Sequence, residues 1–363
     1  MRRLKIAIVD SFCPRPYDGQ TWEHEAMGGT ELTASRIAEM LASHHDMAVL
    51  QHCRTETVIS ANGTRYEPGG QWRRMAAERR FDVVIIINSV KLLALWRKHA
   101  QTDTRLILWR HNFIGKAHRH TGQLLENADA SMLCVSHYHR RHTLEMLGLV
   151  EASRIARRIG VVYNPVITVS DGTKEPVAPA VDTNQLLFAS SPHKGLHQVL
   201  KNFSLLKESI PQLSLIVCTP GYLERTLPAC AGVHYMGKLR PAEVHAHMRR
   251  SLCLFNAQSE FAETFGLVFA EAHSVGTPVI AQRGLGSVNE VVGDAQGQAL
   301  DVNDVAQVHA SIARWRAGQR PCVALNAAFA ANVVKSDWMR LLNADEIRHN
   351  VCWHKTESSS YDL

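Results

Sequence analysis

Two glutamates, Glu263 and Glu271, lie at the start and in the middle of a helical pattern with an apolar stripe. The stripe consists of Phe265, Val268, Phe269, Ala272 and Val275. Eight helical residues rise about 12 Å, which is comparable to the reach of a nucleotide sugar from its ribose to its hexose. Gly266, at the helix start, offers free N–H groups to a diphosphate between the two carboxylates. The spacing fits such a ligand, and the alternative is one glutamate stabilised by the helix dipole and one exposed to solvent.

Glycine and lysine residues elsewhere could bind the phosphates of this ligand. Gly28 and Gly29 precede a helical pattern that begins at Glu31, and without a Cβ they let the backbone approach a phosphate. A plain turn is the alternative for two adjacent glycines. Lys194 stands between a strand pattern and a helical pattern, where its ammonium could stabilise the negative charge of a departing diphosphate. The alternative for this lysine is a place on the solvated surface.

One of the 20 histidines is distinguished by its position. His111 follows the apolar run Leu106–Trp109, which is typical of a buried strand. Ligands of parallel α/β sheets gather at the carboxyl ends of the strands, so His111 is a candidate for the active site.

Short apolar runs alternate with helical patterns along the chain, as expected for strands buried on both faces of a parallel sheet. In the first half the predicted strands are Ile6–Val9, Met47–Leu50, Val83–Ile87, Leu106–Trp109, Ser131–Val135 and Gly160–Tyr163, with a helix at Glu31–Ser43. In the second half they are Leu186–Ala189, Leu213–Cys218, Val233–Met236, Leu252–Phe255 and Pro278–Ala281. The later helices are predicted at Gly195–Glu208, Pro241–Arg249, Thr264–Ser274, Val305–Ala317, Val323–Val334 and Asp337–His349.

This alternation predicts an α/β fold of two Rossmann-like domains whose parallel sheets face each other across a cleft. We expect the first domain at residues 1–168, a linker rich in proline and polar residues at 169–184, and the second domain at 185–335. A helix is expected at 336–350, and the serine-rich residues 354–363 are expected to be a disordered tail.

Several short motifs surround the paired glutamates in a fixed order. They are Gly28-Gly29-Thr30-Glu31, Ser136-His137-Tyr138, Tyr163-Asn164-Pro165, Lys194-Gly195-Leu196, Met236-Gly237-Lys238-Leu239, Phe265-Gly266, Gly276-Thr277-Pro278 and Gly286-Ser287-Val288-Asn289-Glu290. Together with Glu263 and Glu271, they resemble the signature of the retaining glycosyltransferases of family 4, or glycosyl transferases group 1, which have the GT-B fold. The resemblance implies a C-terminal helix that crosses back to the first domain.

The resemblance also implies roles for individual residues. Glu263, with Phe265, Gly266 and Leu267, would hold the donor sugar, and Glu271 would hold the ribose. His111 would hydrogen-bond the transferring sugar or its leaving oxygen. The donor would be a nucleoside-diphosphate sugar such as a UDP- or GDP-sugar, and neither a cofactor nor a metal ion would be needed.

One departure from the family pattern concerns the phosphate site. The family pairs an arginine with its phosphate-binding lysine, whereas the segment that ends at Lys194 contains no arginine. We therefore expect Lys194 to act alone or with His193 and the hydroxyls of Ser190 and Ser191. The residues before Glu263, Asn256-Ala257-Gln258-Ser259, also depart from the family pattern, and they leave the nucleotide base open.

The charge of the chain is concentrated in its first half. Residues 1–174 contain 24 basic and 17 acidic side chains, and the remainder contains 16 and 17. This asymmetry indicates an anionic acceptor, such as a lipid-linked or lipopolysaccharide intermediate, with Arg140 and Arg141 as candidate contacts. A solubilising surface is the alternative.

The cysteines and the hydropathy of the chain indicate the compartment in which the protein works. The eight cysteines include no C-x-x-C pair and read as reduced thiols. No apolar run reaches the roughly 18 residues that a membrane span needs. The expected location is cytoplasmic, with any membrane contact peripheral.

Three other function classes compete with glycosyl transfer. A GT-B relative with different sugar-nucleotide chemistry, such as an epimerase or a phosphorylase, would share the fold. A nucleic-acid-binding protein would explain the basic half, but no recognition motif accompanies the charge, so no nucleic-acid partner is expected. A dinucleotide oxidoreductase would need a G-x-G-x-x-G turn, and the first strand is followed by Asp10-Ser11-Phe12-Cys13-Pro14 instead.

Overall fold

A computed structural model describes residues 2–78, 81–167, 180–219, 228–293 and 295–343. The expected tail at 354–363 lies outside these residues. Within them, no helix is both long enough and apolar enough to span a membrane.

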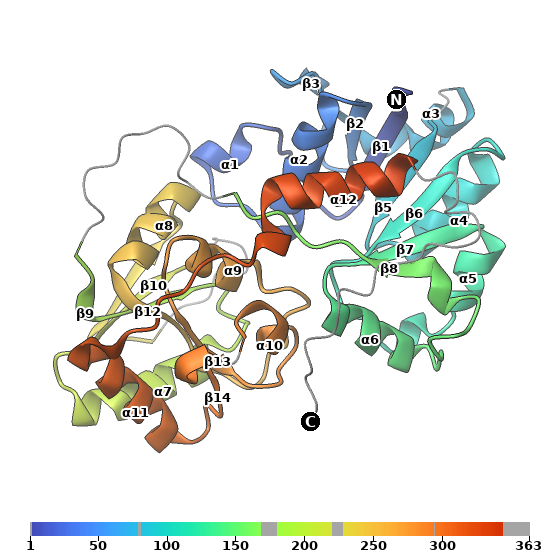
Figure 1. Ribbon diagram of the computed structural model, residues 1–363. Helices are drawn as coiled ribbons and strands as arrows, with labels where there is room; N and C mark the ends of the chain where they lie inside the picture. The colour runs from blue at the N-terminus through green and yellow to red at the C-terminus, as the bar shows by residue number, and fades with distance from the viewer. Residues whose placement is uncertain (1, 79–80, 168–179, 220–227, 294, 344–363) are drawn as a thin grey trace.

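The described chain forms two sheets, as predicted, and Figure 1 shows them in two lobes. The N-terminal sheet has the order β3 (Val58–Ile59), β4 (Arg65–Pro68), β2 (Asp46–Gln51), β1 (Lys5–Asp10), β5 (Val83–Ile87), β6 (Arg105–Trp109), β7 (Ala130–Cys134) and β8 (Ile159–Val161). Its helices are α1 (Thr21–His24), α2 (Gly29–Ala42), α3 (Trp72–Glu78), α4 (Val90–His99), α5 (Thr121–Asn127) and α6 (His137–Met146). All strand pairs are parallel except the pair of β3 with β4.

Burial on both faces explains the continuous apolar strands. In β5, Val83 and Ile85 join one hydrophobic core, and Val84 and Ile86 join another on the opposite face. Successive side chains of a strand point to opposite faces, so a strand between two layers of helices must be apolar throughout.

The C-terminal sheet is parallel in all of its pairings. Its order is β11 (Val233–Gly237), β10 (Ser214–Cys218), β9 (Asp182–Ala189), β12 (Ser251–Asn256), β13 (Val279–Gln282) and β14 (Ala299–Leu300). Its helices are α7 (Leu196–Ser209), α8 (Pro241–Arg250), α9 (Leu267–Ser274), α10 (Val288–Val291) and α11 (Val305–Arg314). Neighbouring strands β9 and β12 carry the loops that contain Lys194 and Glu263, so the topology brings these two loops together.

The last described helix, α12 (Ala331–Asn343), lies against the N-terminal domain (Figure 1, red). Its buried Trp338 packs edge to face on Trp109 of β6, with ring centroids 5.0 Å apart. Arg105 donates hydrogen bonds to the carbonyls of Leu341 and Leu342 at 2.9 and 3.0 Å. These carbonyls lie in the last described turn of α12, so the guanidinium of Arg105 holds this helix on the N-terminal sheet.

Two expected boundaries differ from the structure. Strand β9 begins at Asp182, inside the expected linker 169–184. The sequence pattern did not reveal this start because the first three residues of the strand are polar. Helix α12 begins at Ala331 rather than at 336, and the expected residues 344–350 lie outside the described chain.

The predicted helix Val323–Val334 is wrong. Only Ala327–Phe329 form a short 3-10 turn before α12 begins. Ala330 instead forms a β-bridge with Val166, and the buried Phe329 ring packs on Tyr163 with centroids 4.8 Å apart. Packing between distant segments has overridden the local preference of this alanine-rich stretch.

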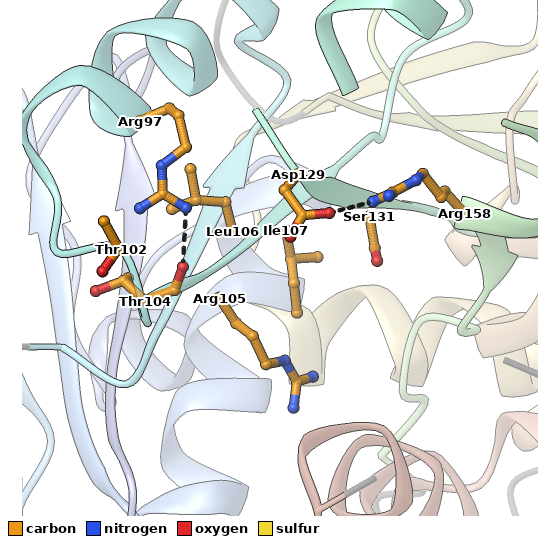
Figure 2. Close-up of a pocket in the computed structure, with 9 residues that line it drawn as sticks. All are labelled: Arg97, Thr102, Thr104, Arg105, Leu106, Ile107, Asp129, Ser131 and Arg158. Carbon is orange, nitrogen blue, oxygen red and sulfur yellow. Dashed lines mark hydrogen bonds and ion pairs between the residues drawn. The ribbon is translucent and has the colours of Figure 1, made fainter. Parts of the chain in front are cut away.

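A small pocket lies at the amino ends of β6 and β7, on the edge opposite to the candidate site (Figure 2). It has a volume of about 30 Å³, and three arginines line it. Arg97 donates to the Thr104 carbonyl at 3.2 Å, Arg158 contacts Asp129 at 2.9 Å, and Arg105 holds α12. The arginines therefore connect parts of the fold, and the pocket has room for little more than a water molecule.

Candidate active site

The predicted donor-binding residues Lys194 and Glu263 form an ion pair. Lys194 follows β9 and Glu263 follows β12, and the Lys194 ammonium lies 2.8 and 3.1 Å from the two Glu263 carboxylate oxygens. The side chains are only 26% and 17% exposed. A cation and a carboxylate that are both largely shielded from water stabilise each other, because either charge alone would lose its hydration without compensation.

The backbone of Glu263 is fixed by the segment Gly286–Ser287. The Ser287 N–H and hydroxyl donate to the Glu263 carbonyl at 3.0 and 3.2 Å. Gly286 has φ +59°, and a Cβ there would overlap the Glu263 backbone. Only glycine therefore fits both the conformation and the close approach.

The loop before Glu263 is organised by the buried side chain of Gln258. Its carbonyl oxygen accepts hydrogen bonds from the N–H groups of Glu260 and Phe261, both at 2.8 Å, and its amide donates to the Phe261 carbonyl at 2.9 Å. The Phe261 ring lies under Lys194, whose ammonium is 5.1 Å from the ring centroid. Gln258, one of the residues that depart from the family pattern, thus helps to position a cation–π contact for the lysine.

His193 lies beside this contact. Its Nδ1 is 2.8 Å from the Ser191 hydroxyl, and its ring meets Phe261 edge to face. The segment without an arginine therefore places the His193 imidazole and the Lys194 ammonium around the Phe261 ring, and the Ser191 hydroxyl orients the imidazole.

Gly266 begins helix α9, as the sequence suggested, with φ +75°. A Cβ at this position would lie 2.5 Å from the Phe269 ring. The Phe265 side chain is buried and packs on Tyr163 and Phe329, with centroids 6.0 and 5.1 Å away. The phenyl ring of Phe265 therefore contributes to packing between the domains.

His111 lies at the carboxyl end of β6, as predicted, and is 7% exposed. Its N–H donates to Asn88 Oδ1 at 2.8 Å, and its carbonyl accepts from the Thr264 hydroxyl at 2.7 Å. Thr264 directly follows Glu263, so this contact brings the two candidate catalytic residues into one region. Asn88, in the left-handed region at φ +56°, was not identified from the sequence, although its place after β5 was a usable signal.

The imidazole of His111 is uncharged at neutral pH. Burial, together with nearby His139 and Arg110, lowers the pKa of His111 to about 3. Its Nε2 is buried and has no hydrogen-bond partner among the described residues. A neutral imidazole can donate from one ring nitrogen and accept at the other, which suits contact with a hydroxyl.

Glu290 joins the two domains near this region. Its carboxylate accepts hydrogen bonds from the N–H groups of His137 and Tyr138, at 2.8 and 2.9 Å, and from the Tyr163 hydroxyl at 2.8 Å. Ser136, which caps the same helix α6, donates to the Thr264 carbonyl at 2.5 Å. A carboxylate is favourable at a helix N-terminus, so Glu290 anchors the second domain on the first.

The loop that contains Gly28 and Gly29 contacts the second domain as well. Gly28 caps α2, and a Cβ on Gly29 would lie 3.9 Å from the Leu267 side chain. A Cβ on Gly28 would overlap the Glu31 carboxylate, whose pKa is raised by burial and by nearby Asp10. The Gly28–Gly29 loop and Leu267 are thus neighbours across the interface.

Glu271 faces an arginine that the sequence analysis missed. Arg36 of α2 lies 3.5 Å from Glu271 Oε1 and donates to the Pro165 carbonyl at 3.2 Å. The Arg36 side chain is 2% exposed, and burial lowers its pKa while Glu271 raises it. Arg36 lies in the predicted helix Glu31–Ser43 but off its apolar stripe of Ala34, Ile37, Ala38 and Leu41, so the local pattern carried no signal of its burial.

The two candidate acceptor arginines lie elsewhere. Arg140 pairs with both oxygens of Glu151 at 2.6 and 2.7 Å and donates to the Ile159 carbonyl at 2.7 Å. Arg141 stacks over the Tyr138 ring, 5.3 Å from its centroid. Arg140 is therefore engaged in holding β8 in place, and these residues do not join the group around Glu263.

In the part of the chain that the structure describes, no three His, Cys, Asp or Glu side chains cluster in a way that could hold a metal ion.

Comparison with known proteins supports the assignment of the fold. Residues 174–332 match the family model described as glycosyl transferases group 1. This segment contains Lys194, Glu263 and Glu271. No curated protein matches the sequence significantly.

Solved glycosyltransferase structures are similar over nearly the whole chain. A glycosyltransferase from Rickettsia africae has 14% identity and a TM-score of 0.67, covering 96% of this chain and 99% of its own. Sucrose-phosphate synthase from Thermosynechococcus elongatus has 14% identity and a TM-score of 0.62, covering 93% and 98%. An α-glucosyltransferase in complex with UDP-glucose and DNA has 12% identity and a TM-score of 0.58, covering 94% and 100%. The fold is therefore GT-B.

The low pKa of His111 predicts a pH-dependent stability. The unfolded chain takes up a proton at this histidine below pH about 6.5, whereas the folded protein resists protonation down to about pH 3. The free energy of unfolding therefore decreases as the pH is lowered from about 6.5 to about 3. In His111→Asn, the slope of unfolding free energy against pH should be shallower, by up to about 1.4 kcal/mol per pH unit. Urea unfolding at a series of pH values measures this slope. Parallel curves for the two proteins would contradict the burial of a neutral His111.

Proposed function

We propose that this protein transfers a sugar from a nucleoside-diphosphate sugar to an acceptor hydroxyl. The observation that carries this proposal is the ion pair of Lys194 with Glu263, next to the contact of Thr264 with His111. The family-model match includes the pair and supports the same activity. We propose further that the protein is a retaining hexosyltransferase of family 4.

The donor would lie across the residues that the interface gathers. The Glu263 carboxylate would accept hydrogen bonds from sugar hydroxyls, the Lys194 ammonium would contact the diphosphate, and Glu271 would hold the ribose. The backbone at Gly28, Gly29, Gly266 and Leu267 would lie close to the phosphates and the sugar. One structurally similar protein is described as a complex with UDP-glucose, and we propose a UDP- or GDP-sugar here.

The reaction needs a stabilised leaving group more than a strong nucleophile. The bond from the sugar C1 to the diphosphate breaks, its electron pair goes to the phosphate oxygen, and C1 bonds to the acceptor oxygen. When the acceptor attacks from the face that the diphosphate leaves, its proton can pass to the departing phosphate. Lys194 stabilises the charge that develops there, and His111 orients a sugar hydroxyl.

The acceptor is proposed from charge. The N-terminal domain carries the basic excess of the chain, and an anionic glycolipid or polysaccharide intermediate of the cell envelope would complement it. Contact with the inner membrane face would then be peripheral.

Substitution of the paired residues tests the active site. In Glu263→Gln the carboxylate that pairs with Lys194 becomes an amide, and we expect turnover to fall by at least about 100-fold while the protein stays folded, with only a modest drop in melting temperature because Lys194 loses its charged partner. Lys194→Ala should have a similar effect on turnover. Glu260→Gln is the matched control, because Glu260 lies in the same loop, is 56% exposed and pairs with His197. Release of nucleoside diphosphate measures turnover, and full activity in Glu263→Gln would refute the assignment.

A chelator tests the role given to Lys194. If the lysine ammonium supplies the positive charge at the leaving diphosphate, sugar transfer measured with and without EDTA should proceed at the same rate. A loss of transfer that added Mg²⁺ or Mn²⁺ restores would show that a metal ion, and not Lys194, carries this role.

A further inference from the structure

A groove lies on the N-terminal domain between α4 and α5. Its volume is about 430 Å³, within the range of about 300–1,000 Å³ that ligand pockets occupy. The walls are formed by Val90, Ala94 and Leu95 of α4, by Leu124 of α5, and by Ala117 before it. In Figure 1 these two helices lie on the outer side of the N-terminal lobe, away from the second domain. The groove therefore opens on a surface that the interface between the domains does not use.

Helix α4 is apolar on two faces. Leu93 and Trp96 are fully buried in the core of the N-terminal domain. Ala94 and Leu95 line the groove on another side and are half-buried. A surface helix of a globular protein needs only one apolar stripe. Ala94 and Leu95 do not belong to the hydrophobic core of the domain, so they are available to contact an apolar ligand in the groove.

Basic side chains frame this apolar surface. Lys91 and Lys98 stand one turn before and one turn after the apolar pair of α4, and His118 and His120 line the side of the groove formed by the α5 loop. Among the described residues that line the groove, none is acidic. The sequence stretches 88–102 and 110–125 contain no aspartate or glutamate at all. An apolar ligand in this groove should therefore also carry a negative charge.

The charge and the shape together favour one occupant. An anionic phospholipid combines hydrocarbon chains with a phosphate, and lysines can lay their apolar stems along the chains while the ammonium groups reach the headgroups. A partner helix would also fit an apolar groove, but the uniform sign of the frame favours a surface of uniform negative charge. A second copy of this chain has a net charge of +6 and would present no such complement as a whole.

The groove is linked to the candidate active site through one loop. This loop begins after β6 with His111, and it continues through the buried Ile114 to Ala117 and His120 at the groove. A membrane bound at α4 and α5 would thus contact the far end of the loop that carries a candidate catalytic residue. The position suits a protein whose acceptor lies at a membrane surface.

We propose that the groove between α4 and α5 binds an acyl chain of an anionic phospholipid and holds the protein at a membrane surface. Lys91 and Lys98 bind the headgroup phosphates, and Ala94 and Leu95 contact the chain. The site is separate from Lys194 and Glu263, so lipid binding and sugar transfer can be tested independently.

Vesicle sedimentation tests this site. The full-length protein should bind vesicles of phosphatidylcholine mixed with an equal amount of phosphatidylglycerol, and it should bind pure phosphatidylcholine weakly. Leu95→Asp should lower the partition coefficient about tenfold or more, because it places a carboxylate where the chain inserts. Val150→Asp is the matched control, since Val150 is an apolar residue of the same domain that is 70% exposed and does not line the groove. Its binding should stay near that of the unmodified protein.

A second variant covers the case in which Leu95→Asp fails to fold. Replacing Lys91 and Lys98 together by serine leaves the apolar walls intact and should also reduce binding to the anionic vesicles. The shift of melting temperature with a nucleotide sugar should stay the same in all of these variants, which separates lipid binding from the donor site. Absence of vesicle binding by the unmodified protein, or equal binding by all variants, would overturn the proposal. Concentration-dependent dimers that Leu95→Asp abolishes would overturn it in favour of a second copy.

Discussion

The arrangement of the site depends on one electrostatic constraint, the pairing of Lys194 with Glu263 in a partly buried place. The two partners are not equivalent. The Glu263 backbone is fixed by Gly286 and Ser287, whereas Lys194 reaches it through a flexible side chain with four methylene groups. A diphosphate can therefore draw the ammonium away while the carboxylate stays in place for a sugar hydroxyl. Lys194 would then supply the positive charge at the leaving diphosphate, and Glu263 would accept a hydrogen bond from the donor sugar.

This constraint is coupled to the contact between the domains. The residue after Glu263 bonds to His111 and Ser136 of the first domain, and Glu290 and Arg36 make further polar links across the same interface. A movement of one domain relative to the other would change the distance between His111 and Glu263. The interface thus determines whether His111 and Glu263 can contact the same substrate. The groove between α4 and α5 is not part of this interface.

The sequence was sufficient for features set by local pattern. Apolar runs located the buried strands, Gly266 was placed correctly at the start of a helix, and Lys194 was placed correctly between a strand and a helix. Features set by long-range packing were beyond it. The polar start of β9 resembled a linker, and Phe329 and Ala330 left the helical pattern to pack on Tyr163 and Val166. Strands β3 and β4, with two and four residues, are too short to form a recognisable apolar run. Asn88 and Arg36 were missed because their importance lies in partners distant along the chain.

The most direct test of the account is the melting temperature of the protein with a panel of UDP-, GDP-, ADP-, TDP- and CDP-sugars, NAD and a DNA oligomer. A ligand that binds only the folded state stabilises it by about 2.7 kcal/mol at a hundredfold over its dissociation constant. We predict a shift with one class of nucleotide sugar and the loss of that shift in Lys194→Ala. A shift with NAD or DNA and none with any nucleotide sugar would contradict it.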